Sequence, residues 1–291
     1  GKTNILDAIY YLCYTKSHFN NKEKYNIQYN TNGFRIEGEF LNDSHKDIIT
    51  SVWKEGKKTI SFNNIPYEKV SEHIGKYNAV MIAPDDTALI TGILSIQDTH
   101  YLEQLIQYQK IIAQKNAYLK NVFGNTVDHT LLDIYDQQLI EPACYLISKR
   151  TQLKQIFPNL ITHYYSQLCN EVETASLTYK SCCSMDSFAQ LLVQSRAKDL
   201  EYRRATLGPH TEDWDFMIKG VPCKNHASQG QKKSYLISLK LAQLEILREK
   251  KIKPILLLDD IFEKLDSKRI TFFFKLLNEF DFQQIFLTRL I

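Results

Sequence analysis

The chain has 291 residues, with 36 Lys and Arg against 33 Asp and Glu, so its formal net charge is only +3. This balance excludes a chain that is basic throughout, although it permits a local basic face for nucleic acid. The hydrophobic content of 44% is enough for a globular core, and no apolar run approaches the length that spans a bilayer. We therefore expect a globular, cytoplasmic protein with no membrane partner.

The six cysteines form no CxxC pair and have no histidine at a ligand spacing, so we expect reduced thiols rather than a zinc site.

The chain begins with the residues GKTNILDAIYYL. Gly1, Lys2 and Thr3 match the end of a phosphate-binding loop of the form GxxxxGK[ST]. Apolar spacing predicts a helix over residues 4–12, with an apolar side formed by Ile5, Leu6, Ile9 and Leu12. In such a loop Lys2 reaches the β- and γ-phosphates, Thr3 ligates Mg²⁺, and backbone amides such as that of Gly1 cradle the phosphates. The tripeptide alone is weak evidence, because it is common by chance.

Four strands are predicted next along the chain. Apolar and polar residues alternate over residues 34–40, 48–53 and 57–62, which is typical of half-buried antiparallel strands. Residues 79–82 form a short apolar run that ends at Pro84, which predicts a further strand.

A long helical region follows the strands. Apolar residues keep a helical spacing over residues 102–119 and 131–154, which predicts two long helices that form an arm. Pro142 and Pro158 are expected to mark kinks or helix boundaries, with a further helix over residues 159–171. The arm is either an interaction surface or an antiparallel hairpin whose two helices bury their apolar faces against each other. The hairpin needs no ligand to explain it.

The chain then alternates between strands and turns. Strands are predicted over residues 174–180, 215–218 and 221–223, and a helix over residues 187–199. His210 lies in the turn Gly-Pro-His, where it is either an ordinary turn histidine or a functional one.

The last third of the chain contains a turn, a helix and a buried strand in succession. Ser228 is a good N-cap for a helix with one apolar face, formed by Ile237, Leu241, Leu244 and Leu247. The apolar run of residues 255–258 is too short for a helix and predicts a strand that is buried on both faces.

Two carboxylates, Asp259 and Asp260, follow this strand directly. Open α/β sheets bind ligands at the carboxyl ends of their strands, so the pair matches a Walker B motif. Asp259 is then the Mg²⁺ ligand, and Asp260 is the catalytic residue that orients the attacking water. Alone, the pattern also fits a strand with an acidic turn, and the start of the chain decides between the two interpretations.

Five segments carry a resemblance to a known family: GKTNILDAIYYL at the start, MIAPDD at residues 81–86, LGPHTEDWDF at 207–216, ASQGQ at 227–231 and LLLDDIFEKLD at 256–266. Over most of its length the chain resembles the RecF family of bacterial DNA repair ATPases, which are related to SMC heads and ABC ATPases. Since the chain starts inside a motif and ends abruptly, we expect native segments outside this sequence.

The resemblance implies an α/β fold, a P-loop ABC/SMC-like ATPase lobe with a mixed sheet and an inserted helical lobe. The expected division is residues 1–88 for the first part of the ATPase lobe, 89–194 for the helical lobe, and 195–291 for the second part of the ATPase lobe. The resemblance also implies a nucleotide-binding role for further residues, namely Ser228, Gln229, Gly230, Gln231, Asp266 and His210. Thr211 stands where the family has a basic residue, so an anion-binding role there is in doubt.

The function that the resemblance implies is ATP-dependent DNA binding at gaps or at single-strand to double-strand junctions, with RecO and RecR as partners in loading the recombinase RecA. ATP would drive a homodimer in which Ser228 of one subunit faces the γ-phosphate held by the other, and the enzyme would be a weak, DNA-stimulated ATPase. Two alternatives stay open. One is a nucleotide-gated clamp with negligible hydrolysis, since brisk relatives usually have Glu where Asp260 stands. The other is a different SMC-like head.

Overall fold

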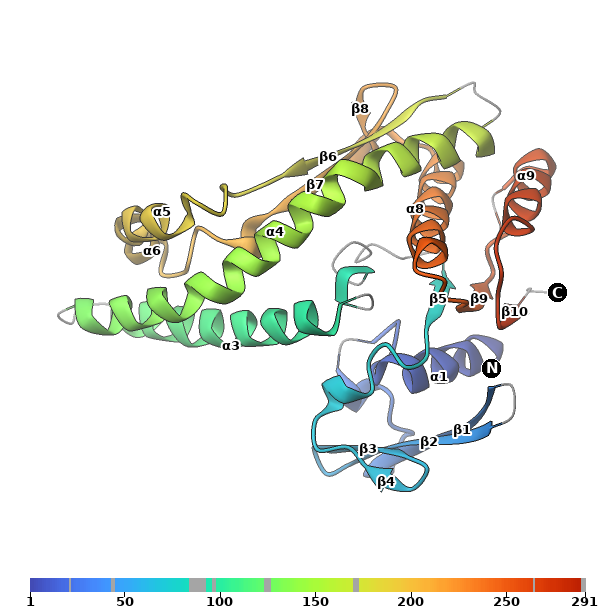
Figure 1. Ribbon diagram of the computed structural model, residues 1–291, viewed down its shortest axis with the longest axis horizontal. Helices are drawn as coiled ribbons and strands as arrows, with labels where there is room; N and C mark the ends of the chain where they lie inside the picture. Colours follow the sequence, from blue (N-terminus) through green and yellow to red (C-terminus); the bar gives the residue numbers. More distant parts are fainter. Residues whose placement is uncertain are drawn as a thin grey trace. The chain divides into compact units, whose positions relative to one another are not determined.

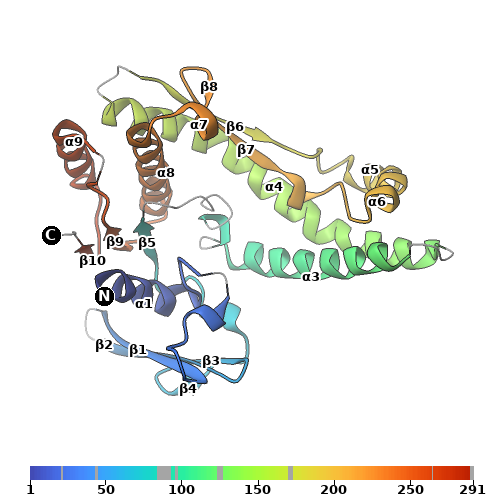
Figure 2. The ribbon, with the colours of Figure 1, turned by 180° about the vertical axis from the view of Figure 1, so that it is seen from behind.

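The computed structural model describes residues 1–20, 22–42, 45–83, 93–95, 98–122, 127–169, 173–263 and 265–288. The chain divides into two compact units, one formed by residues 1–99 and 229–291 and the other by residues 100–228. The ribbon is coloured along the sequence in Figure 1 and seen from behind in Figure 2. The first unit therefore takes its residues from both ends of the chain, whereas the second is continuous.

A parallel sheet forms the middle of the first unit. It consists of β5 (Ala79–Ile82), β9 (Ile255–Asp259) and β10 (Gln284–Thr288), in the order β10-β9-β5. Every residue of the central strand β9 is buried, because the strand has neighbours on both edges and packed elements on both faces. The prediction of a strand buried on both faces is confirmed.

An antiparallel sheet lies below the parallel sheet in Figure 1. It consists of β1 (Gly33–Asn42), β2 (His45–Lys54), β3 (Lys57–Phe62) and β4 (Ile65–Pro66), in chain order. The three antiparallel strands that the alternation predicted are confirmed. β1 and β2 extend beyond their predicted ends, and β3 has the predicted bounds.

Helix α1 (Lys2–Tyr14) lies between the two sheets (Figures 1 and 2). Its Leu6 and Cys13 join a core cluster with Ile49 of β2 and Leu257 of β9. Ile5 was predicted on the same apolar side, and that was wrong, since it is 62% exposed. Ile5 lies about 100° around the helix from Leu6, on a side of α1 that is not covered by the core cluster.

Two hydrogen-bonded side chains fix α1 against its surroundings. The Tyr14 hydroxyl donates to the Ala79 carbonyl at 2.7 Å and accepts from the Ala79 N–H at 2.9 Å. The ring Nε2 of His73 lies 2.6 Å from the Leu12 carbonyl, to which it donates. The His73 bond occupies a carbonyl near the C-terminus of α1, and the Tyr14 bonds tie the helix to β5.

Helices α8 (Gln229–Glu249) and α9 (Ser267–Leu277) complete the first unit, together with short 3-10 helices at Glu23–Tyr25 and Val70–Glu72. Helix α8 packs against β5. Its predicted apolar face is confirmed, since all four residues of that face are buried: Ile237, Leu241, Leu244 and Leu247.

The second unit is built on a helical hairpin of α3 (Thr99–Asn121) and α4 (His129–Leu168). Asp128 caps α4, because its carboxylate accepts from the Leu131 N–H at 3.0 Å. The predicted arm of two long helices is confirmed. Pro142 and Pro158 do not end a helix, however, because α4 runs through both of them, so the separate helix expected from residue 159 is wrong.

An antiparallel sheet packs on α4. It consists of β6 (Ala175–Lys180), β7 (Asp213–Ile218) and β8 (Val221–Pro222), and β6 alternates buried and exposed residues. The helix predicted over residues 187–199 is split at Ser195 into α5 (Phe188–Gln194) and α6 (Arg196–Tyr202). A 3-10 helix at Pro209–Thr211 precedes β7, and the short helix α7 (Cys223–His226) follows β8.

A buried ion network joins the helices of the second unit. The ammonium of Lys115, on α3, is fully buried and lies 3.0 Å from a carboxylate oxygen of Asp136 and 2.9 Å from one of Asp199. Arg196 pairs with the second oxygen of Asp136 at 2.7 Å. The network therefore ties α3, α4 and α6 together through charges that are largely buried.

The division at residues 88 and 194 that the sequence predicts stays a prediction. The compact units meet at residues 99/100 and 228/229. None of the described helices combines the length and the apolar character that a membrane crossing needs.

Candidate nucleotide-binding site

The two ends of the chain meet at the carboxyl edge of the parallel sheet. Thr3, in the first turn of α1, donates its hydroxyl hydrogen to Oδ1 of Asp259 at 3.1 Å. Asp259 is the last residue of β9, so the buried strand delivers its carboxylate to this edge. The two residues predicted to hold Mg²⁺ are thus brought together across almost the whole sequence.

A third residue completes this cluster, and the sequence reasoning missed it. Thr288 ends β10 and is paired in register with Asp259. Its hydroxyl donates to the same Oδ1 of Asp259 at 2.6 Å. The signal that could have found it is the polar residue at the end of the strand IFLT, because parallel neighbours end at the same edge.

The cluster fits a divalent cation. Asp259 is only 6% exposed, and among the described residues no cationic side chain forms an ion pair with it. A buried carboxylate without a counter-charge is costly, and an oxygen-lined site of this kind suits Mg²⁺. With both hydroxyl hydrogens directed to Oδ1, Oδ2 and the hydroxyl lone pairs are left to face a metal or its water.

The residues predicted to bind phosphate lie at the start of α1. Lys2 is the first residue of the helix and Gly1 is its N-cap, without a side-chain cap and without an acidic residue in the first turn. A side chain added at Gly1 would meet nothing within 4 Å. Backbone amides and partial positive charge at a helix N-terminus favour an anion, so the position agrees with the predicted role of Gly1, Lys2 and Thr3.

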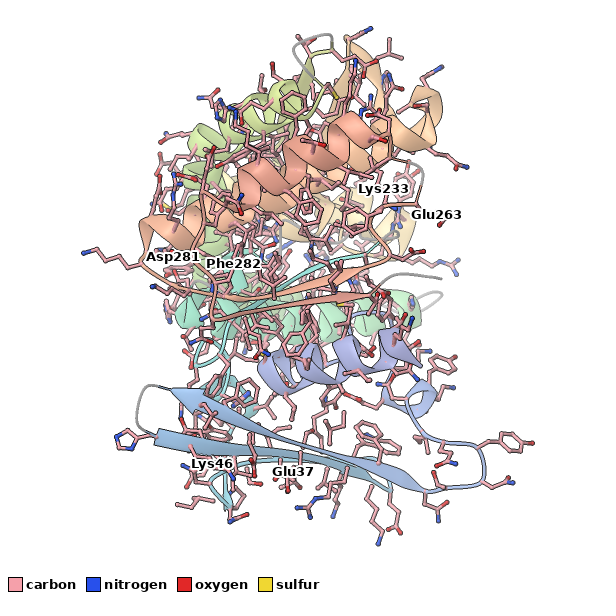
Figure 3. The ribbon with its side chains drawn as sticks, turned by 90° about the vertical axis from the view of Figure 1, so that its right-hand side faces the viewer. Glu37, Lys46, Lys233, Glu263, Asp281 and Phe282 are labelled. Carbon is pink, nitrogen blue, oxygen red and sulfur yellow. The ribbon has the colours of Figure 1, made fainter. Side chains whose placement is uncertain are left out.

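Asp260 leaves the strand in an unusual conformation. Its φ is 46°, a left-handed value that is uncommon outside glycine. Lys233 of α8 holds this turn, because its ammonium donates to the carbonyls of Asp260 at 3.0 Å and of Glu263 at 2.6 Å (Figure 3). No described residue donates a hydrogen bond to the carboxylate of Asp260, so that group is open to water. The sequence reasoning did not find Lys233.

Of the further residues predicted to bind nucleotide, Gln229, Gly230 and Gln231 begin α8 in the first unit. Ser228 comes directly before them and is exposed, and it closes the second unit. Asp266 caps α9 by accepting from the Arg269 N–H at 2.9 Å, which is a structural use of its carboxylate. Nucleotide-binding roles for these residues stay predictions.

His210 belongs to the second unit. Its Nδ1 accepts from the Tyr108 hydroxyl at 2.6 Å, and its Nε2 lies 3.1 Å from the Ala205 carbonyl, to which it donates. Burial lowers the pKa of His210 below the usual value for histidine, which favours the neutral ring. Both nitrogens are therefore engaged within the unit, and a nucleotide-binding role for His210 stays a prediction. Part of the MIAPDD segment, residues 84–86, lies outside the described residues.

The comparisons with known proteins agree on one family. No family model matches the chain. The DNA replication and repair protein RecF of Flavobacterium johnsoniae is 38% identical over 302 residues, which cover 99% of this chain and 84% of that protein. The protein of the same name from Cytophaga hutchinsonii is 36% identical over 301 residues, covering 99% and 80%.

Two solved structures show the same fold. The recombination mediator protein RecF-ATP of the RecFOR pathway matches with a TM-score of 0.87 and 26% identity, covering 100% of this chain and 83% of that one. The RecF-ATPrS structure matches with a TM-score of 0.85 and 27% identity, covering 100% and 84%. The predicted α/β ATPase fold with a helical lobe is confirmed.

Proposed function

This chain belongs to the RecF family of DNA replication and repair proteins, and on that premise we propose that it binds ATP and DNA as a recombination mediator. It acts at gapped DNA or at junctions between single and double strands, where it promotes loading of the recombinase RecA. The related RecF structures were solved with ATP and with ATPrS and are named for the RecFOR pathway, which supports RecO and RecR as partners. We place this work in the cytoplasm, with the chromosome.

The observation that carries the proposal is the hydrogen bond between Thr3 and Asp259. It joins a residue of the predicted phosphate-binding loop to a residue of the predicted Walker B strand, at the edge of a parallel sheet. Neither motif is decisive alone, but a nucleotide site needs both of them within contact distance. Thr3 and Asp259 would hold a bound Mg²⁺, which would supply positive charge to neutralise part of the phosphate charge.

The chain's own residues have distinct roles at this site. Lys2 places a positive charge at the phosphates, and Thr3 and Asp259 hold the metal. Asp260 orients the attacking water, and Lys233 fixes the backbone from which Asp260 projects.

ATP also acts as the switch between two states. Ser228 and the first residues of α8 face the γ-phosphate that a second subunit holds, so ATP joins two subunits and ADP does not. The N-terminus of a helix offers unpaired amides and about half a positive charge, which favours an anion placed opposite it.

A nucleotide-gated clamp with negligible hydrolysis is the second candidate function. Asp260 favours it, because an Asp carboxylate lies about one methylene farther from the water than Glu would, and the backbone here is held by Lys233. In a clamp of this kind, ATP binding determines whether the subunits assemble, and slow ATP hydrolysis returns them to the unassembled state.

ATP turnover by the protein with and without gapped DNA tests the proposal. We expect slow phosphate release that rises when gapped DNA is added and rises less with intact duplex. Release that gapped DNA leaves unchanged would favour the clamp, and a protein that does not bind ATP would rule out both functions.

Two substitutions separate the roles of the adjacent carboxylates. Asp260→Asn should retain ATP binding and lower the turnover by about 100-fold or more, because it removes the group that orients and polarises the water. Asp259→Asn should instead weaken binding only when Mg²⁺ is present, as measured by calorimetry with and without the metal. Normal turnover by both variants would mean that the strand end is structural.

A further inference from the structure

A polar pocket lies in the second unit, and of the residues predicted above to bind nucleotide it includes His210. It has a volume of about 610 Å³. Asn116 of α3 lines it, together with Lys198 and Tyr202 of α6 and with Arg204 and His210 of the turn that follows. Apart from the predicted role of His210, none of the functions proposed so far uses this pocket.

The walls of the pocket are fixed by hydrogen bonds. Oδ1 of Asn116 accepts from the Ala205 N–H at 2.7 Å. The backbone N–H and the hydroxyl of Thr206 both donate to Oδ1 of Asp199, each at 2.7 Å. The segment between α6 and β7 is therefore held by the helices rather than left to move, so a ligand would not have to order it.

The turn at the far side of the pocket is equally constrained. Gly208 has a φ of 136°, and a side chain there would come within 2.3 Å of the Tyr108 hydroxyl, so only glycine fits. The same hydroxyl donates to His210, whose lowered pKa favours the neutral ring. His210 thus shapes the pocket without contributing a positive charge to it.

The charge of the pocket comes from Lys198 and Arg204, which are both exposed. No carboxylate lines the pocket, and within the described part of the chain neither cation forms an ion pair. Asp199, the nearest buried acid, is already paired with Lys115 at 2.9 Å. Two cations without counter-charges at one pocket favour a ligand with more than one negative charge.

The remaining groups add a flat apolar surface and a donor. Tyr202 is 54% exposed, and the ammonium of Lys198, one helical turn before it, lies 5.9 Å from the centre of its ring. Because Oδ1 of Asn116 is used by Ala205, the amide of Asn116 presents its NH₂ group as a hydrogen-bond donor. An exposed aromatic ring beside cations is the arrangement on which a base stacks while its backbone is held.

We propose that this pocket binds single-stranded DNA, with Lys198 and Arg204 at successive backbone phosphates and Tyr202 stacked against a base. The Asn116 amide donates to a phosphate or to a base edge. The proposal rests on the DNA-binding function above and assigns part of it to the helical unit. A duplex keeps its bases stacked inside, so the Tyr202 contact selects the single-stranded side of a gap.

Fluorescence anisotropy with a labelled oligothymidylate tests the charges. Lys198→Ala combined with Arg204→Ala should weaken binding at least about tenfold at low salt. Each phosphate contact on a single strand contributes about 0.7 to the slope of log affinity against log salt, so losing two contacts should reduce the slope by about 1.4. Lys110→Ala with Lys154→Ala removes the same charge from exposed helical positions outside the pocket and should leave the slope unchanged.

Two substitutions at Tyr202 test the stacking. Tyr202→Phe keeps the ring and should bind the oligothymidylate like the parent, whereas Tyr202→Leu should lose at least about fivefold in affinity. Equal losses for Phe and Leu would overturn the stacking contact. Unchanged binding by Leu would do the same.

The same samples separate this proposal from its premise. Each variant should keep the ATP affinity and the thermal unfolding midpoint of the parent, and inorganic phosphate at millimolar concentration should not displace the oligonucleotide. If the parent binds DNA and the Lys198 and Arg204 variant binds it equally well, the pocket is not the site. If that variant loses duplex and single strand by the same factor, or loses ATP, the assignment to single strands is wrong. A parent that binds no DNA at all would refute the proposed function itself.

Discussion

A Lys2→Ala variant should lose ATP binding by about 30-fold or more, the effect expected when one partner of a desolvated charge pair is removed. Lys2 begins α1, and we propose that its charge lies at the β- and γ-phosphates of ATP. The helix itself should be unharmed, since alanine is a strong helix former. Calorimetric titration with ATP in the presence of Mg²⁺ measures the loss directly.

Lys54→Ala is the matched control for this experiment. Lys54 ends β2 in the same unit and is exposed, so its removal changes the net charge equally without touching α1. The control should bind ATP like the parent. Equal affinities for the Lys2 variant and the parent would remove the phosphate-binding loop from the account.

The largest effect on stability is expected at Lys115. Its ammonium is fully buried between two carboxylates that are 5% and 1% exposed. Lys115→Ala leaves both carboxylates buried with only part of their counter-charge, and breaking such a pair costs about 3–5 kcal/mol. Chemical denaturation followed by far-UV circular dichroism should show the second unit unfolding at a lower denaturant concentration.

Lys219→Ala serves as the comparison within the same unit. Lys219 is 56% exposed and lies 3.8 Å from Glu173, and an exposed pair of this kind contributes little. Its unfolding midpoint should match that of the parent. A Lys115 variant with the same midpoint would mean that the ion network contributes nothing to stability.

The parts of the fold that could be predicted are those set by local pattern. Residues 255–258 are all apolar, with no polar residue for a solvent-facing side, so the sequence predicted a strand that is buried on both faces. The alternation over residues 48–53 and 57–62 similarly required one buried face. Period and burial are properties that a short segment carries by itself.

The parts that could not be predicted depend on distant neighbours. Pro142 and Pro158 each remove a backbone hydrogen bond from α4, at a cost of about 3 kcal/mol each in an isolated helix. The helix nevertheless continues, because its buried side packs against β6, α5 and the 3-10 helix at Pro209–Thr211. A local rule for proline does not contain that compensation.

The site shows the same division. Thr3 and Asp259 could be proposed from motifs, but the hydroxyl of Thr288 and the ammonium of Lys233 reach the site only because strand order and helix packing bring them there. The pairing of Thr288 with Asp259 follows from the parallel register of β10 on β9, and the polar residue that ends IFLT is a signal only once that pairing is known. Lys115 was missed for a related reason, since a lysine on a helix is usually exposed.

Sedimentation velocity tests the central claim, that ATP joins two subunits through the residue before α8. With ATP and Mg²⁺ the Asp260→Asn protein, which should not hydrolyse, is expected to sediment as a dimer, and with ADP as a monomer. Ser228→Asp keeps a good helix cap but sets a negative charge against the γ-phosphate, so in that background the ATP sample should stay monomeric. An ATP-induced dimer that survives Ser228→Asp, or the same species with ATP and ADP, would contradict the account.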